Sequence, residues 1–308
     1  MLTIAYFTNR LEPKIEWFFD SLGNQAKGER LRVVVVDYHA GNPDRRAQVD
    51  ALAKDRFDLV HVEPKPTVWQ GKHRLTTRDY FAASNARNTA ICLAPDGHIA
   101  LVDDLSCLQP GWLDRVKMHV STAPGRITCG AYRKVLEMTV RHGEVVHYKN
   151  NPIGNDHRLS WVSPGHVRNC GGDWMYGCSL VAPVNAFLDC NGYDEDCDGM
   201  GYEDVVCGTM LAAHGWSFAY DPNMMTFESE ELHHTSGNAF LRVNKGISPN
   251  DASHKMLDML RKGRKTAPNY FGEGGIRALR QAVLSGEPFP VVQVPQHHWP
   301  DGQPLSEM

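Results

Sequence analysis

The chain of 308 residues has no long hydrophobic run, no excess of basic residues and no C-x-x-C pair. Without a segment of roughly 20 apolar residues, a membrane-spanning helix is excluded. The first eight residues, MLTIAYFT, lack the basic start and long apolar stretch of a signal peptide, so we expect a cytoplasmic protein. A formal net charge of −4 excludes a global nucleic-acid footprint and leaves only a local basic patch possible.

Cysteine is present but is not arranged for disulfides or zinc. The eight cysteines stand singly, mostly in apolar or glycine-rich segments, so we expect buried, reduced thiols. Hydrophobic residues make up 42% of the chain and charged residues 22%, as in an ordinary globular protein. The length allows one large domain or two small ones.

The N-terminal third alternates between strand and helix patterns. Apolar runs at 2–8, 31–36 and 59–62 predict buried strands, and stripes at 14–22 and 47–53 predict the helices between them. This β-α-β-α-β order is typical of an α/β fold with a parallel sheet.

A fourth strand carries the first acidic pair. The segment 79–93 predicts a helix, and 98–102 predicts a strand that delivers Asp103 and Asp104 to its carboxyl end. In open α/β sheets that end is where ligands bind.

A helix is expected to open at 110–112. After about residue 127 the pattern of strands and helices becomes mixed. Further strands are predicted at 127–135, 137–142, 178–183 and 217–220, helices at 184–191, 203–215 and 252–265, a loop at 150–173 and a tail at 268–308.

Two acidic dyads are the main candidates for chemistry. Asp103 and Asp104 are adjacent carboxylates in a turn, which repel each other unless they are paired or bind a cation. Glu203 and Asp204 end a stretch, 191–204, with six carboxylates in fourteen residues. Asp204 falls in the first turn of a helix, where the helix dipole favours an anion. The alternatives are a capping aspartate and a solvated acidic turn; the spacing does not fit an EF-hand.

Weaker signals accompany the dyads. His233 and His234 suit a metal but also suit an exposed polar loop. Arg87 suits phosphate binding or a solvated helix face. Aromatic side chains in polar or glycine-rich segments suit stacking on a sugar or base: Trp69, Trp161, Trp174 and Tyr176. A basic helix at 255–265 would either bind phosphate or face solvent.

The order of these motifs carries a resemblance. A strand ending in Thr8-Asn9 is followed by one ending in Asp37, by Ala86-Arg87-Asn88, and by the Asp103-Asp104 dyad. Then come Pro110-Gly111-Trp112-Leu113, Asn191-Gly192-Tyr193-Asp194-Glu195, Gly201-Tyr202-Glu203-Asp204 and a C-terminal histidine. In this order the chain resembles a GT-A glycosyltransferase, closest to glycosyltransferase family 2, over roughly residues 2–235.

The resemblance implies an architecture. We expect the GT-A fold: a mixed, mostly parallel central sheet flanked by helices, with a C-terminal helical and irregular extension. Residues 1–125 would form the donor half, 126–240 the acceptor and catalytic half of the same domain, and 241–308 the extension.

The resemblance also implies a reaction and its residues. It implies inverting transfer of a hexose from a nucleotide-diphosphate sugar, UDP-linked, to a hydroxyl of a glycan, metabolite, protein or modified nucleic-acid base. Asp204 would be the general base and Glu203 would orient hydroxyls, with Trp174 near the sugar or acceptor. The remaining implied residues are Thr8, Asp37, Arg87 and Asp103 for the donor, and Asp104, His233 and His234 for Mn²⁺ or Mg²⁺.

One position departs from the family pattern. An acid is usual two residues after the first Asp of the dyad, and here that residue is Leu105. The departure predicts a metal site with more water or weaker binding. The alternatives are a nucleotidyltransferase, although residues 8–14 lack its glycine-rich phosphate loop, and a catalytically weak sugar-nucleotide-binding protein.

Overall fold

The computed structural model describes residues 1–75, 79–163, 165–198, 201–235, 258 and 263–291. Four parallel strands form its N-terminal half in the order β3-β2-β1-β4. The elements are β1 Leu2–Thr8, α1 Ile15–Ala26, β2 Leu31–Asp37, α2 Pro43–Ala53, β3 Phe57–Val62, α3 Ala83–Leu93 and β4 His98–Asp103. Because the strands are parallel, their carboxyl ends meet at one edge of the sheet.

Strands of both directions extend this sheet to ten strands within the described residues. Strand β9 pairs antiparallel with β4 and β6, β10 runs parallel to β6, and β5 closes the path antiparallel to β10. The bounds are β5 Ser106–Leu108, β6 Arg126–Arg141, β7 Glu144–Lys149, β8 Arg168–Cys170, β9 Leu180–Pro183 and β10 Ser217–Ser229. The mixed α/β class and the flanking helices are as predicted.

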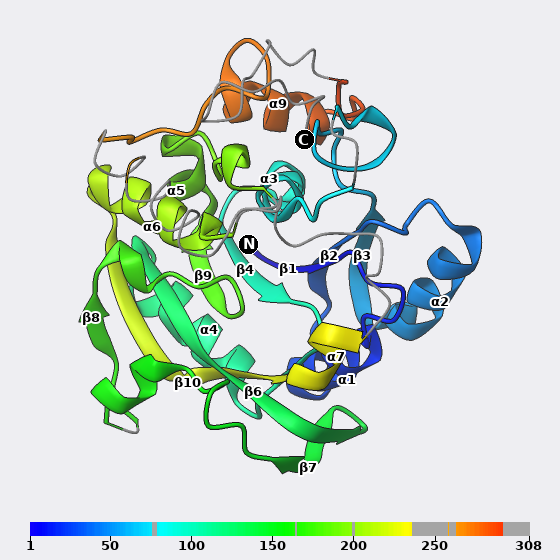
Figure 1. The fold of residues 1–308 in the computed structure, drawn as a ribbon, viewed down its shortest axis with the longest axis vertical. Coiled ribbons are helices and arrows are strands. Elements are labelled where there is room, and N and C mark those ends of the chain that lie inside the picture. Colours follow the sequence, from blue (N-terminus) through cyan, green and yellow to red (C-terminus); the bar gives the residue numbers. More distant parts are fainter. Residues whose placement is uncertain (76–78, 164, 199–200, 236–257, 259–262, 292–308) are drawn as a thin grey trace.

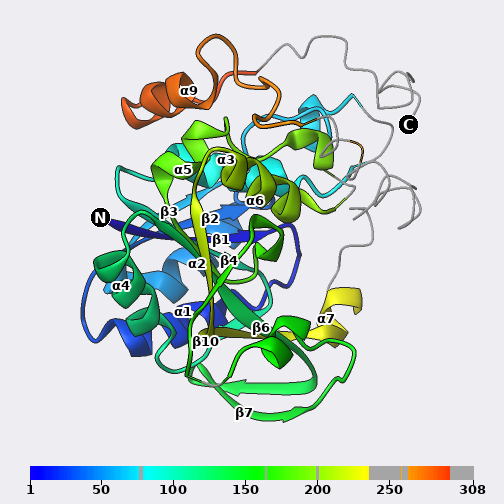
Figure 2. The ribbon, with the colours of Figure 1, turned by 90° about the vertical axis from the view of Figure 1, so that its left-hand side faces the viewer.

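Helices cover both faces of the sheet (Figure 1). The later helices are α4 Trp112–Thr122, α5 Val184–Asp189, α6 Glu203–Ala213, α7 Glu230–Thr235 and α9 Gly275–Leu284. Figure 1 shows α3, α5 and α6 above β1 and β4 and α1 below them, and α4 packs with α1 in the core on that other face. In Figure 2, α9 lies outside α3 and α5, and it packs against α3.

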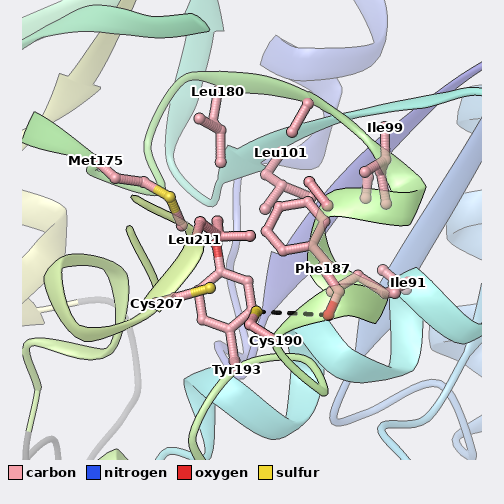
Figure 3. Packing of buried hydrophobic residues seen from close by; sticks show 14 of the residues in the cluster. Ile91, Ile99, Leu101, Met175, Leu180, Phe187, Cys190, Tyr193, Cys207 and Leu211 are labelled. Atoms are coloured by element: carbon pink, nitrogen blue, oxygen red, sulfur yellow. Dashed lines mark hydrogen bonds between the residues drawn. The ribbon is translucent and has the colours of Figure 1, made fainter. Parts of the chain in front are cut away.

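Two hydrophobic cores follow from the period of two along each strand. In β4, Ile99 and Leu101 face the core shared with α3, α5 and α6, whereas Ala100 and Val102 face the core shared with α1, α2 and α4. Figure 3 shows the first core, where Phe187 and Tyr193 pack near Leu101. Burial on both faces explains why the middle residues of β1, β2 and β4 are apolar.

The second half differs from the expected elements in several places. Strand β6 runs unbroken where two strands were predicted. Glu137 adopts a φ of 50° and the register of the pairing with β7 shifts there, but this irregularity does not end the strand. Strands β7 and β8 and the extension of β10 beyond 220 were not predicted. Helix α9 lies in the segment expected to be an irregular tail.

Two further predictions concern the C-terminal region. His233 and His234 were expected on a polar loop, and they lie in α7. The helix predicted at 252–265 falls largely outside the described residues; Arg264 and Lys265 at its end are not helical. All eight cysteines are unpaired thiols and seven are buried, which confirms that expectation. No helix in the described part of the chain has the length and apolarity that crossing a bilayer requires.

Candidate active site

The carboxyl ends of β1 and β4 meet the N-terminus of α6 around a cavity of about 300 Å³. Strand β4 ends at Asp103, and a tight turn with a φ of 59° at Leu105 reverses the chain into β5. Charged residues dominate the lining, notably Arg10, Arg87, Asp103, Asp104, Glu203 and Asp204. A second cavity, of about 240 Å³, shares several lining residues with the first and adds Tyr132 and Tyr176. Both acidic dyads therefore reach one continuous site.

Arg87 joins the two dyads. This buried guanidinium donates from Nη2 to Asp103 and from Nη1 to Glu203, both at 3.0 Å, and its Nε lies 3.4 Å from Asp204 Oδ1. Burial lowers the pKa of Arg87, but the three carboxylates outweigh it and raise the pKa well above its ordinary value. All three guanidinium nitrogens thus face protein carboxylates.

Asp204 occupies the most constrained position. Its Oδ2 accepts a 2.8 Å hydrogen bond from the Gly177 backbone N–H. A Cβ on Gly177 would clash with the Arg87 guanidinium and lie 2.8 Å from Asp204 Oδ1, so this close approach requires glycine.

The pKa of Asp204 is raised to about 7. Burial is the largest cause, Arg87 opposes it, and the negative charges of Glu203 and Asp103 add to it. Burial likewise raises the pKa of Asp103 to about 6 against the pull of Arg87. Carboxyl groups with pKa values near neutrality are suited to proton transfer.

Asp104 is bound by two side chains from the end of β1. Its Oδ2 accepts a 2.8 Å hydrogen bond from the Thr8 hydroxyl, and its Oδ1 accepts one of 3.0 Å from Arg10 Nε. Arg10 also reaches α7, where its Nη2 lies 3.1 Å from His233 Nδ1. The other ring nitrogen of His233 lies 3.2 Å from Glu228 Oε2.

Three of the predicted site residues line neither cavity. Thr8 instead binds Asp104. Asp37 is fully buried and bound by protein partners, with Arg45 Nε at 2.9 Å and His61 Nε2 at 3.2 Å. Trp174 packs at 5.5 Å on both Trp161 and Tyr220 and lines neither cavity. The side chain of His234 lies outside the described residues.

The acidic stretch 191–204 serves mainly as scaffold. Asp198 accepts the backbone N–H groups of Ser84 and Asn85 at 2.6 and 3.2 Å, which caps the first turn of α3. Glu195 bonds Asn88 on the same helix at 2.9 Å and pairs with Lys65 at 2.7 Å. These contacts fix the helix that carries Arg87.

Solved structures resemble this arrangement. TarS of S. aureus, residues 1–349, matches with a TM-score of 0.51 and 11% identity in its complex with UDP-GlcNAc, over 74% of this chain and 58% of that one. Its complex with UDP matches with a TM-score of 0.53 and 11% identity, over 85% and 71%. GalNAc-T7 with UDP, GalNAc and Mn²⁺ matches with a TM-score of 0.50 and 10% identity, over 94% and 59%.

The chain has the GT-A fold. No family model matches the sequence, and no curated protein matches it either. The chain spans slightly under three fifths of the length of the TarS fragment bound to UDP-GlcNAc. The structural similarity establishes the GT-A architecture. Because the sequence identities are this low, the activity has to be argued from the site.

Several lining residues of this GT-A site were missed in the sequence. Arg10 comes two residues after the first strand, which pairs with the strand that ends just before Asp104, so its place was a usable signal. Lys134 lies in β6, 3.9 Å from Glu228 in the adjacent β10, and lines both cavities. The sequence gives a weaker signal for Lys134, because nothing in it indicates that β6 pairs with β10.

Proposed function

We propose that the chain is an inverting glycosyltransferase that moves a hexose from a nucleotide-diphosphate sugar, UDP-linked, to an acceptor hydroxyl. The observation that carries the proposal is the Asp204 carboxyl, half-buried in the lining of the cavity with its pKa raised to about 7. The GT-A fold supports it, since two similar structures hold UDP or UDP-GlcNAc.

The reaction needs one base and one displacement. Asp204 takes the proton of the acceptor hydroxyl as the acceptor oxygen bonds the anomeric carbon. The bond from that carbon to the diphosphate oxygen breaks in line, and the nucleoside diphosphate leaves with the electron pair, so the anomeric configuration inverts. A base with a pKa near the working pH is the most effective proton acceptor. Arg87 holds Glu203 and Asp204 in position.

Cations and aromatic rings give the two cavities different roles. Arg10 and Lys134 line the 300 Å³ cavity, where positive charge offsets the charge that develops on the leaving diphosphate. Tyr132 and Tyr176 line the 240 Å³ cavity, and their rings offer faces on which a sugar can stack. We assign the first cavity to the diphosphate and the second to the acceptor.

Metal assistance by Mn²⁺ or Mg²⁺ stays a prediction of the resemblance, and GalNAc-T7 contains Mn²⁺ in its structure. Among the residues described here, no three His, Cys, Asp or Glu side chains group in a way that could hold a metal ion. Asp104 is instead bound by Thr8 and Arg10. The side chains that the structure describes around Asp104 therefore do not fit a metal, and the mechanism above needs none.

Mass spectrometry after incubation with a panel of nucleotide sugars and acceptors, in Mn²⁺ and in EDTA, tests the proposal. We expect nucleoside diphosphate and a glycosylated acceptor. Asp204→Asn should lower turnover by roughly 10²- to 10⁴-fold while donor binding persists. Asp114→Asn, at an exposed position on α4, is the matched control.

The other outcomes separate the alternatives. Full transfer by Asp204→Asn would disprove the base assignment. Pyrophosphate release would identify a nucleotidyltransferase, and donor binding without any reaction a sugar-nucleotide-binding protein.

A further inference from the structure

Arg10 stands between two of the side chains that the resemblance assigns to a metal. Its Nε lies 3.0 Å from Asp104, and its Nη2 lies 3.1 Å from His233 Nδ1. Its Nη1 donates at 3.2 Å to the backbone carbonyls of Leu232 and His233. A divalent ion ligated by both Asp104 and His233 would need the position that this guanidinium fills.

The arrangement is built into the fold. Arg10 is 7% exposed and follows the carboxyl end of β1, which pairs with the strand that carries the dyad. Thr8, two residues earlier, donates its hydroxyl to the other oxygen of Asp104. The two residues therefore bind both oxygens of Asp104 from one short segment, and Asp104 serves as an anchor for a side-chain cation.

An arginine suits this role chemically. Its guanidinium is charged at every physiological pH, and its planar fork matches phosphate oxygens. Arg10 and Lys134 both line the cavity assigned above to the diphosphate. Leu105, where the family pattern has an acid, agrees with a site that binds an organic cation in place of a metal.

We propose that Arg10 takes the place of the divalent cation, so that the chain binds the donor diphosphate and transfers the sugar without a metal. The inference rests on the proposed glycosyltransferase function and specifies how its leaving group is stabilised. With Lys134, Arg10 places positive charge beside the diphosphate oxygens in the ground state and during departure.

The test is calorimetric binding of UDP, GDP, ADP and CDP to the full chain, in EDTA and then in Mn²⁺. We expect one of them to bind with similar affinity in both buffers. Arg10→Ala should weaken that binding roughly 10- to 100-fold in EDTA, and Arg10→Lys should keep part of it. Arg32→Ala, which removes an arginine paired with the half-exposed Asp58, is the matched control.

One readout separates this role from a merely structural one. In Arg10→Ala the position between Asp104 and His233 is open, so Mn²⁺ should now restore nucleotide binding that it does not improve in the unmodified chain. Binding that requires Mn²⁺ in the unmodified chain overturns the inference and leaves the proposed function standing. If no nucleoside diphosphate binds in either buffer, the proposed function fails as well.

Discussion

The Arg87 guanidinium donates a 3.0 Å hydrogen bond to Asp103, which joins helix α3 to the end of strand β4. The same group binds Glu203 and lies beside Asp204, so one arginine balances carboxylates from two distant dyads. The rings of Phe7 and Tyr193, 5.6 and 5.5 Å from its central carbon, hold it in place. The charge state of the candidate base therefore depends on Arg87.

Arg87→Lys should lower kcat/KM by roughly 100-fold, because one ammonium cannot hold three carboxylates and small displacements at a reacting group are costly. Arg87→Gln, which also removes the positive charge that lysine keeps, should in addition move the acidic limb of the pH profile to higher pH, since the Arg87 charge lowers the pKa of Asp204. Rates from pH 5 to 9 measure both effects. Arg32→Lys is the control, and a lower rate with an unshifted limb in Arg87→Gln would contradict the electrostatic role.

The pH profile of the unmodified chain should rise to a plateau with an apparent pKa near 7, the value for Asp204. The base must be deprotonated, so activity is lost as the pH falls through that value. Glu203→Gln should shift this limb to lower pH by roughly half a unit to one unit, because a neighbouring negative charge is removed. A limb that stays in place or moves upward in Glu203→Gln would contradict the coupling.

Local sequence pattern was enough to predict the N-terminal half of the fold. The strand that ends at Asp37 is buried on both faces, so its apolar residues are consecutive in the sequence. The change to a charged residue at Asp37 marks where the strand ends. The strand that ends at Asp103 has the same signature, and together they predicted the edge where the site forms. Both acidic dyads were predicted as site residues, and the structure brings them together.

The contacts within the site could not be predicted, because they join residues far apart in the chain. Arg10 and Asp104 are separated by 94 residues, and a single arginine after a strand has no periodicity to reveal its partner. The role of Asp198 as a cap for α3 was hidden for the same reason, since its carboxylate serves a helix more than 100 residues earlier. An acidic stretch therefore suggested ligand binding where the structure has helix capping.

Asp204→Asn should stabilise the chain at pH 8. A folded-state pKa raised from 3.8 to about 7 means that the folded chain holds a proton that the unfolded chain releases. Stability therefore falls as the pH rises from about 4 to 7, and a neutral asparagine avoids this loss. We expect about 1–2 kcal/mol at pH 8, less than the full pKa shift corresponds to, because the surroundings relax around the charge.

Thermal unfolding of both proteins at pH 8, 6 and 4.5 measures this difference. The melting temperature of Asp204→Asn should exceed that of the unmodified chain by a few degrees at pH 8, and the gap should shrink toward pH 4.5. An equal or lower melting temperature at pH 8 would mean that the Arg87 ion pair outweighs the cost of burying the Asp204 charge. The expected gain is typical of a catalytic group that is held at a cost in stability.

Gly177→Ala tests the closest approach in the site. The added methyl group would meet the Arg87 guanidinium and lie 2.8 Å from Asp204 Oδ1, so both groups must move. We expect kcat to fall by roughly 100-fold, as for other small displacements of reacting groups, with the fold retained. Gly125→Ala is the matched control, because nothing lies within 4 Å of a methyl group there.

The Gly177→Ala result also separates displacement of the base from loss of donor binding. The cavity that we assign to the diphosphate is lined by Arg10 and Lys134, neither of which the added methyl group meets, so nucleotide affinity should change much less than kcat. A parallel loss of both would mean that the variant disrupts the whole site. Activity equal to that of Gly125→Ala would mean that displacing the Asp204 carboxyl and the Arg87 guanidinium does not impair transfer, which would contradict the assignment of Asp204 as the base.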